Sequence, residues 1–176
     1  MVLFGIYTGQ RLADLARLTW EHIDTVAQEI SLVTAKTSRV VRIPIVQPLM
    51  SHIAGLPAGK DSKSFLHPRA AACRMSANST RFGDLLASIG LIESRTHRAK
   101  DGQGRAARRA VSELSFHSLR HTATSLMKNA GVSPAIVQDI IGHDSAEMSA
   151  HYTHVESASK RTALETLPDM FRPSPP

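Results

Sequence analysis

The sequence predicts an α+β fold that is mainly α-helical, with a small antiparallel β-sheet near the N-terminal third. Much of the chain carries apolar residues at intervals of three and four, the period of a helix with one buried face. One segment, 30–45, instead places apolar and β-branched residues on both sides of a polar turn, which indicates a hairpin. With 176 residues, of which 42% are hydrophobic, the chain is expected to form a single domain spanning 1–176.

The first elements surround a glycine. Met1–Tyr7 is apolar and has the composition of a helix end, and Gly9 interrupts it. Apolar residues then return at helical spacing, at Leu12, Leu15 and Ala16, so a second helix is expected there.

The predicted hairpin is centred on the polar turn Lys36–Arg39, with apolar runs at 30–33 and 40–45. A further strand is expected near Trp20–Asp24. Pro44 has no N–H to donate, so we expect it at a strand end or a sheet edge.

The other helices are predicted from apolar spacing together with start and stop signals. Ser133 followed by Pro134 is a strong start signal, and Gly90 and Gly131 are stop signals after two apolar stripes. Segment 93–110 has no apolar period and is predicted to be a basic flexible loop. The predicted helices are Pro48–Ala54, one around Ser79–Ile89, one from Ser115 to Gly131, one from Ser133 to Gly142, one starting near Ser145 that includes Tyr152, and a tail helix over Ser157–Leu167 within the tail 156–176.

The charge and the cysteine content restrict the class of protein. A net charge of +6 and a pI near 10.0 favour an anionic partner but do not identify a fold. The single cysteine, Cys73, excludes an internal disulfide and fits a reducing compartment. The sequence has no apolar stretch long enough to cross a membrane, and its N-terminal run lacks the features of a secretion signal. We therefore predict a cytoplasmic protein.

Two arginines suggest a phosphate site. His117 and Arg120 are spaced i, i+3 at the start of a helix, so their side chains point the same way, and a helix N-terminus attracts anions. Arg11 lies far upstream. Arginine stays charged and binds phosphate oxygens through two donors at once. Taken singly, each arginine is better explained as a surface residue, and it is the combination that favours a site.

A histidine and a tyrosine could complete such a site. His143 follows Gly142 at a helix end, where glycine permits a sharp reversal, although taken alone it is better explained as a structural histidine. Tyr152 has polar neighbours, whereas Tyr7 lies in an apolar run that suits core packing. A tyrosine oxygen can attack a phosphodiester and form a covalent intermediate that conserves the bond energy without ATP.

Four blocks of the sequence together resemble the catalytic domain of the tyrosine recombinase, or phage integrase, family. They are TGQRLADLARLTWEHID at 8–24, AKT at 35–37, FHSLRHTATSLMKNAG at 116–131 and IGHDSAEMSAHYTHV at 141–155. Their order, internal spacing and separation all agree with the family. The resemblance implies the fold of that domain and a site-specific recombinase or integrase that cuts and rejoins DNA through a 3′-phosphotyrosyl intermediate, without ATP, metal or another cofactor.

The resemblance implies how the phosphate would be held. Arg11, Arg120 and His143 would clamp the scissile phosphate. Asp14, one helical turn after the first arginine, would support and orient the arginine cluster.

The resemblance also implies how protons would move. Tyr152 would be the nucleophile, and His117 would assist its proton transfer. Lys36, in the hairpin turn, would be the general acid that protonates the leaving 5′ oxygen, although Lys60 and Lys63 also lie in predicted loops.

Double-stranded DNA is the partner that the resemblance implies, with a homo-tetramer on DNA, a monomer or weak oligomer when free, and association with the nucleoid when bound. The tail could pack on a neighbouring protomer or on its own domain.

Family members commonly carry an N-terminal DNA-clamping domain and a further helix before the first arginine, and neither fits before Arg11, so both are expected to be absent. The predicted DNA-binding residues are Arg39, Arg95, Arg98, Lys100, Arg105, Arg108 and Arg109.

Three alternatives remain at this point. A zinc enzyme could use His117 with His121 and His151 with His154, but Ser118 stands where a His-Glu-x-x-His motif needs glutamate. A truncated, non-catalytic DNA-binding remnant of an integrase is the second. An enzyme similar to the type IB topoisomerases, which share phosphotyrosyl chemistry, is the third.

Overall fold

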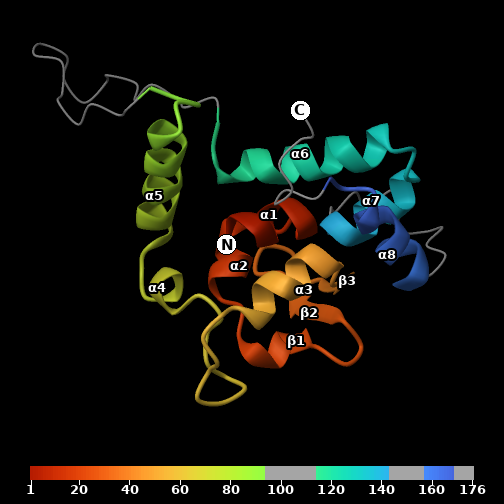
Figure 1. Ribbon diagram of the computed structural model, residues 1–176, viewed down its shortest axis with the longest axis horizontal. Coiled ribbons are helices and arrows are strands. Elements are labelled where there is room, and N and C mark those ends of the chain that lie inside the picture. The colour runs from red at the N-terminus through yellow and green to blue at the C-terminus, as the bar shows by residue number, and fades with distance from the viewer. Residues whose placement is uncertain (94–113, 143–156, 169–176) are drawn as a thin grey trace, which may run out of the picture.

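The computed structural model describes residues 1–93, 114–142 and 157–168, and there it confirms the predicted fold class (Figure 1). Helices dominate, and a small antiparallel sheet lies in the N-terminal third. The helix predicted near Ser145 lies outside the described residues. The described helices are α1 (Val2–Thr8), α2 (Leu12–Ala16), the 3₁₀ helix η1 (Trp20–His22), α3 (Gln47–Ala54), α4 (Pro68–Ala71), α5 (Met75–Ser88), α6 (Phe116–Asn129), α7 (Pro134–Ile141) and α8 (Ser157–Glu165).

The sheet consists of β1 (Ile23–Asp24), β2 (Glu29–Val33) and β3 (Val40–Pro44), paired in that order. The predicted hairpin is therefore confirmed. The additional strand is shorter than expected, because the residues before it form η1. Pro44 pairs with Glu29 at the end of β3, which agrees with the expected position of a proline that cannot donate a ladder hydrogen bond.

The hairpin turn is fixed by one buried threonine. Val33 pairs with Val40, and residues 34–39 connect them. The backbone N–H of Thr34 donates to the carbonyl of Arg39 over 2.9 Å, and its hydroxyl lies 2.6 Å from that of Thr37. These bonds give the exposed turn that carries Lys36 a defined base on the sheet.

Gly9 allows the chain to turn between α1 and α2. Its φ is +62°, in the left-handed region where side chains are disfavoured. A Cβ atom at this position would lie 2.0 Å from Cδ1 of Ile141, so there is also no room for one. The turn brings Arg11 directly to the N-terminal end of α2.

The core contains apolar side chains of α1, α6 and α7 together with those of the buried face of the sheet. Figure 1 shows α6 running along α1, and the two helices are in contact. Spacing of three and four residues on each helix directs its apolar side chains to the same interior. The buried apolar residues of α1, α6 and α7 are Phe4, Ile6, Tyr7, Phe116, Ala123, Met127, Val137, Ile140 and Ile141.

Helix α5 begins at Met75, earlier than the expected start near Ser79. Its first turn, Met75–Asn78, lies outside the apolar stripe that begins at Phe82, but Asn78 is buried and donates from Nδ2 to the carbonyl of Ala70 over 2.9 Å. A tertiary hydrogen bond therefore extends the helix. The stop is close to the expected place, since the helix ends at Ser88.

Helix α8 packs back on its own chain in this structure. Ala163 and Leu164 are buried, and Arg161 donates from Nη1 to the carbonyl of Ile45 over 3.2 Å. The hydroxyl of Tyr7 donates to the carbonyl of Pro168 over 3.1 Å. The tail helix is thus confirmed, ending slightly earlier than predicted.

Candidate active site

A capping box fixes the start of helix α6, and a hydrogen bond to Gly9 fixes the side chain of Arg120 on the same helix. Ser115 and Ser118 form a capping box, with the N–H of Ser115 donating to the hydroxyl of Ser118 over 3.0 Å. Just over one helical turn after Phe116, Arg120 is only 2% exposed, and its Nη1 donates to the carbonyl oxygen of Gly9 over 2.8 Å. This bond connects α6 to the turn that precedes Arg11.

Two charged neighbours, Arg11 and Asp14, affect the pKa of Arg120. Burial, followed by the charge of Arg11, lowers the pKa of Arg120 to about 10, whereas the Asp14 carboxylate acts in the opposite direction. The guanidinium therefore stays charged at neutral pH. Two arginines and one carboxylate thus lie close enough to influence one another strongly.

Arg11 lies at the start of α2 and has a buried nitrogen, Nη1, that bonds to none of the described residues. It is the N-cap residue of α2, with extended backbone angles, and its side chain is partly buried. Its Nη1 atom is buried and has no hydrogen-bond partner within the described part of the chain. A buried donor without a partner is costly, so the site is suited to an acceptor supplied from outside.

Asp14 connects α2 to the hairpin turn. It is 7% exposed, and its Oδ1 accepts a hydrogen bond from the backbone N–H of Ala35 over 2.8 Å. Ala35 directly precedes Lys36, whose side chain is exposed. The carboxylate therefore fixes where the turn begins, as well as balancing the arginine charges.

His117 lies near Arg11, Lys36 and Arg120. Its ring meets that of His121 edge to face, with centroids 4.7 Å apart. Partial burial, then the charges of His121, Arg120, Arg11 and Lys36, lower its pKa, so the imidazole is neutral at pH 7. A neutral imidazole has a nitrogen lone pair that can accept a proton.

A family model described as the phage integrase family matches residues 1–159. The chain belongs to this family. Tyrosine recombinase XerC of Bifidobacterium longum (strain DJO10A) is 33% identical over 155 residues, which are 84% of this chain and 40% of that protein. XerC of Mycobacterium tuberculosis (strain ATCC 25177 / H37Ra) is 28% identical over 159 residues, 90% of this chain and 49% of that protein. The chain therefore spans less than half the length of these relatives.

Solved integrase structures share the fold. The integrase from mycobacterium phage Brujita superimposes with a TM-score of 0.67 at 19% identity, covering 97% of this chain and 51% of that one. The lambda integrase catalytic core gives 0.52 at 19% identity and covers 82% of this chain and 80% of that one. These neighbours agree with a catalytic-core fold of mainly helical type.

Among the predicted site residues, the structure brings together Arg11, Asp14, Lys36, His117 and Arg120. His143 and Tyr152 lie outside the described residues. Gly142, the residue before His143 in the sequence, terminates α7 with φ +70°. The six predicted DNA-binding residues between 95 and 109 also lie outside: Arg95, Arg98, Lys100, Arg105, Arg108 and Arg109.

Arg39 is engaged within the protein. Its Nη2 donates to Oδ1 of Asp139 over 2.7 Å, and Lys160 forms a second ion pair with the same carboxylate. Asp139 therefore connects the hairpin turn, α7 and α8. The predicted contact of Arg39 with DNA remains a prediction, and such a contact would compete with this ion pair.

Gln10 is a residue of the site region that sequence reasoning missed. It is 1% exposed, and its Nε2 donates to the carbonyl oxygens of Ile140 over 2.8 Å and Thr8 over 3.1 Å. A glutamine beside an arginine gives no sign of burial in the sequence. Only the tertiary structure shows that it joins the Arg11 turn to the end of α7.

The described residues include no group of three or more His, Cys, Asp or Glu side chains placed to hold a metal ion. His151 and His154, which the zinc alternative would use, lie outside them. Within the same residues, no helix has both the length and the apolar character needed to span a membrane.

Proposed function

We propose that this chain is the catalytic domain of a site-specific tyrosine recombinase, which cuts and rejoins DNA through a 3′-phosphotyrosyl intermediate on Tyr152. The observation that carries the proposal is the contact of Arg120 with the carbonyl of Gly9, which holds two arginines from distant parts of the chain beside one another. Membership of the phage integrase family supports the same chemistry.

The arginines would stabilise the reacting phosphate. Attack on phosphorus increases the negative charge on the non-bridging oxygens, and fixed cationic donors stabilise that charge without reorganising. Arg120 is rigid because it is buried and bonded, and Arg11 has a donor available. His143 would complete the clamp.

The remaining residues would move protons. The Tyr152 oxygen attacks phosphorus while its proton passes to His117, the P–O5′ bond breaks, and Lys36 gives a proton to the leaving 5′ oxygen. The lowered pKa of His117 leaves its ring neutral, so that it is free to accept this proton. The bond between Asp14 and the backbone of Ala35 supports the role of Lys36, because it fixes the start of the turn. Rejoining reverses these steps.

Double-stranded DNA would be the partner, and a homo-tetramer would assemble on it. The net charge of +6 favours a polyanion. One solved neighbour, the integrase of the transposon Tn1549, is a complex with circular intermediate DNA, at a TM-score of 0.54.

Covalent trapping tests the proposal. The chain is incubated with a pool of nicked duplexes of randomised sequence, so that cleavage releases a short strand and the adduct cannot be religated. We expect a denaturant-stable protein–DNA adduct from the wild type and from the matched variant Tyr7→Phe, and none from Tyr152→Phe. Duplex binding without any adduct would indicate the non-catalytic remnant, and relaxation of supercoiled plasmid without sequence preference would indicate topoisomerase-like activity.

A further inference from the structure

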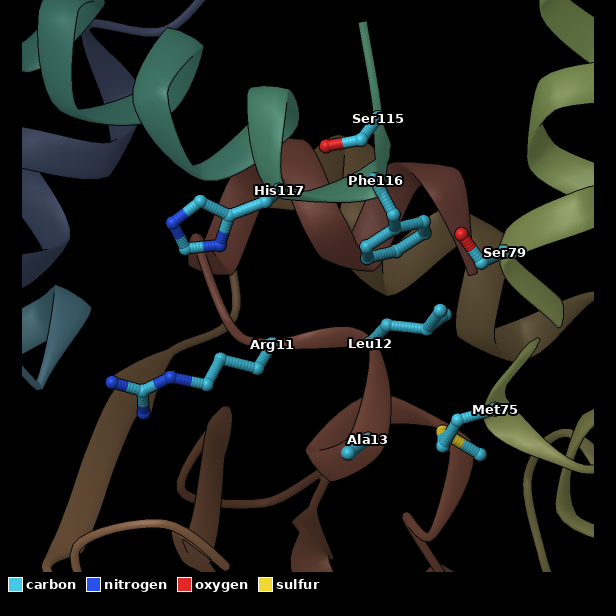
Figure 2. Close-up of a pocket in the computed structure, with 8 residues that line it drawn as sticks. All are labelled: Arg11, Leu12, Ala13, Met75, Ser79, Ser115, Phe116 and His117. Atoms are coloured by element: carbon cyan, nitrogen blue, oxygen red, sulfur yellow. The ribbon is translucent and has the colours of Figure 1, made fainter. Parts of the chain in front are cut away.

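A pocket of about 310 Å³ lies beside the arginine cluster, between α2, α5 and the start of α6 (Figure 2). This volume is at the lower end of the range found for small-ligand sites, roughly 300–1,000 Å³. Most of its wall takes no part in the catalytic roles proposed above. The lining residues are Arg11, Leu12, Ala13, Met75, Ser79, Ser115, Phe116 and His117.

The two sides of the pocket differ in chemistry. Figure 2 shows the guanidinium of Arg11 and the imidazole of His117 on one side, with Leu12, Phe116 and Met75 on the other. A ligand that satisfies both sides has an anionic group joined to an apolar body. The Nη1 atom of Arg11, buried and without a partner among the described residues, favours an oxyanion with several acceptor oxygens.

The apolar side of the pocket also includes a serine hydroxyl that could bond to a ligand. Ser115 already uses its hydroxyl to cap α6. Ser79, from α5, makes no side-chain hydrogen bond to the described residues and lines the pocket. A ligand body with polar atoms at its edge and an apolar face would therefore fit better than a pure hydrocarbon.

We propose that this pocket binds the nucleoside joined to the phosphate that Arg11 holds, so that Met75 and Ser79 contact the DNA next to the cleaved bond. A nucleoside phosphate has the required parts: an anion, a sugar and base with apolar faces, and acceptors at the base edge. The inference rests on the proposed function, because the phosphate in question is the scissile one. It makes α5 a contributor to sequence preference at that nucleotide.

Binding is measured first with a small probe. The methionine methyl groups are labelled with carbon-13, and their NMR signals are followed during titration with thymidine 3′-phosphate. We expect the Met75 signal to shift and to saturate at a concentration about tenfold lower than with inorganic phosphate or thymidine alone, since each of these fills one side only. The Met50 signal, from α3, should stay constant as a control. An unchanged Met75 signal, or equal affinity for inorganic phosphate alone, would overturn the inference.

A pair of substitutions on α5 tests the location. Ser79→Leu should fill the apolar side and weaken nucleotide binding about tenfold or more, whereas Ser76→Leu, at an exposed position on the same helix, should leave it unchanged. Circular dichroism of both variants checks that the helix is retained. Equal affinity of Ser79→Leu and the wild type would place the ligand elsewhere.

The source of the nucleoside phosphate is tested by repeating the titration with a short duplex of randomised sequence. A Met75 shift with both probes assigns the pocket to DNA, and a shift with the free nucleotide only overturns that assignment. The outcome is separate from that of the proposed function. An adduct on Tyr152 with a silent Met75 signal would refute the pocket alone. A Met75 response without any adduct would show that the pocket binds a nucleotide, but it would refute the recombinase chemistry and with it the identity of the phosphate as the scissile one.

Discussion

The side-chain amide of Gln10 donates to the carbonyl oxygen of Ile140 across 2.8 Å, and so joins the turn before Arg11 to the last turn of α7. Gly9, one residue earlier, accepts a bond from Arg120. Two consecutive residues therefore connect α1, α6 and α7. This short segment therefore helps to hold the arginine pair in position.

Replacing Gln10 by leucine should destabilise the fold. The substitution keeps the approximate size of the side chain but leaves a buried carbonyl without its donor, which costs about 1–2 kcal/mol of unfolding free energy. Urea unfolding followed by circular dichroism measures the change. The control is Gln47→Leu, on the exposed start of α3, which should change stability by less than about 0.5 kcal/mol. Equal effects at the two positions would show that the Gln10 bond contributes nothing.

Gly9→Ala should be more harmful than the same substitution at Gly131. Both glycines have positive φ, +62° and +78°, so each alanine suffers the left-handed strain of about 1–2 kcal/mol. At Gly9 the new Cβ would also lie 2.0 Å from Cδ1 of Ile141, whereas nothing lies within 4 Å at Gly131.

The difference between these two alanine variants isolates the steric part. We expect overpacking at Gly9 to cost an additional 1–3 kcal/mol, roughly, of unfolding free energy. Gly9→Ala should therefore lower the thermal midpoint clearly further than Gly131→Ala. Differential scanning calorimetry gives both values under one set of conditions. Similar midpoints would mean that Ile141 moves aside without cost.

The sequence predicted this architecture because its elements have local signals, and the proposed site residues stand out in the sequence because each lies in a short local motif. The hairpin could be placed from its polar turn, and the start of α7 from Ser133 and Pro134, since both depend on neighbouring residues. Gln10 and Asp139 could not be found in this way. Their partners lie far away along the chain, and neither residue type is usually buried.

Asp14→Ala should impair catalysis through the hairpin turn. The variant loses the bond to the backbone of Ala35, and it also leaves the positive charges of Arg11 and Arg120 without their carboxylate. We expect adduct formation to slow by about tenfold or more, the equivalent of about 1.4 kcal/mol. Asp14→Asn keeps the acceptor and should lose less. If the two variants were equally slow, the charge and not the bond to the turn would be responsible.

Acid should destabilise the protein through His67. Burial, above all, lowers the pKa of this histidine to about 4, and its ring packs edge-on against Phe4 with centroids 5.1 Å apart. The unfolded chain, with a pKa near 6.5, therefore binds more protons than the folded chain as the pH falls. The stability contributed by the neutral ring is complete above about pH 6.5 and is lost progressively towards pH 4.

Urea midpoints between pH 7.5 and pH 4 measure this effect against a variant that cannot titrate there. His67→Gln should flatten the fall in midpoint below about pH 6.5, because the unfolded variant no longer takes up a proton at this position. The remaining slope belongs to other groups, including His52, which also contacts Phe4. Parallel curves for the wild type and the variant would show that His67 does not control the acid response.

Arg120→Lys should abolish most activity while leaving the fold intact. The guanidinium bonds to Gly9 through one nitrogen and can present others to a phosphate, and a single ammonium group cannot reproduce that planar fork. Losing one donor to a developing oxyanion costs about 10²–10³ in rate, so adduct formation should fall by at least about a hundredfold. Arg42→Lys, at an exposed position of β3, is the matched control and should react at the wild-type rate. A near-normal rate for Arg120→Lys, measured on folded protein, would mean that a positive charge alone suffices at this position.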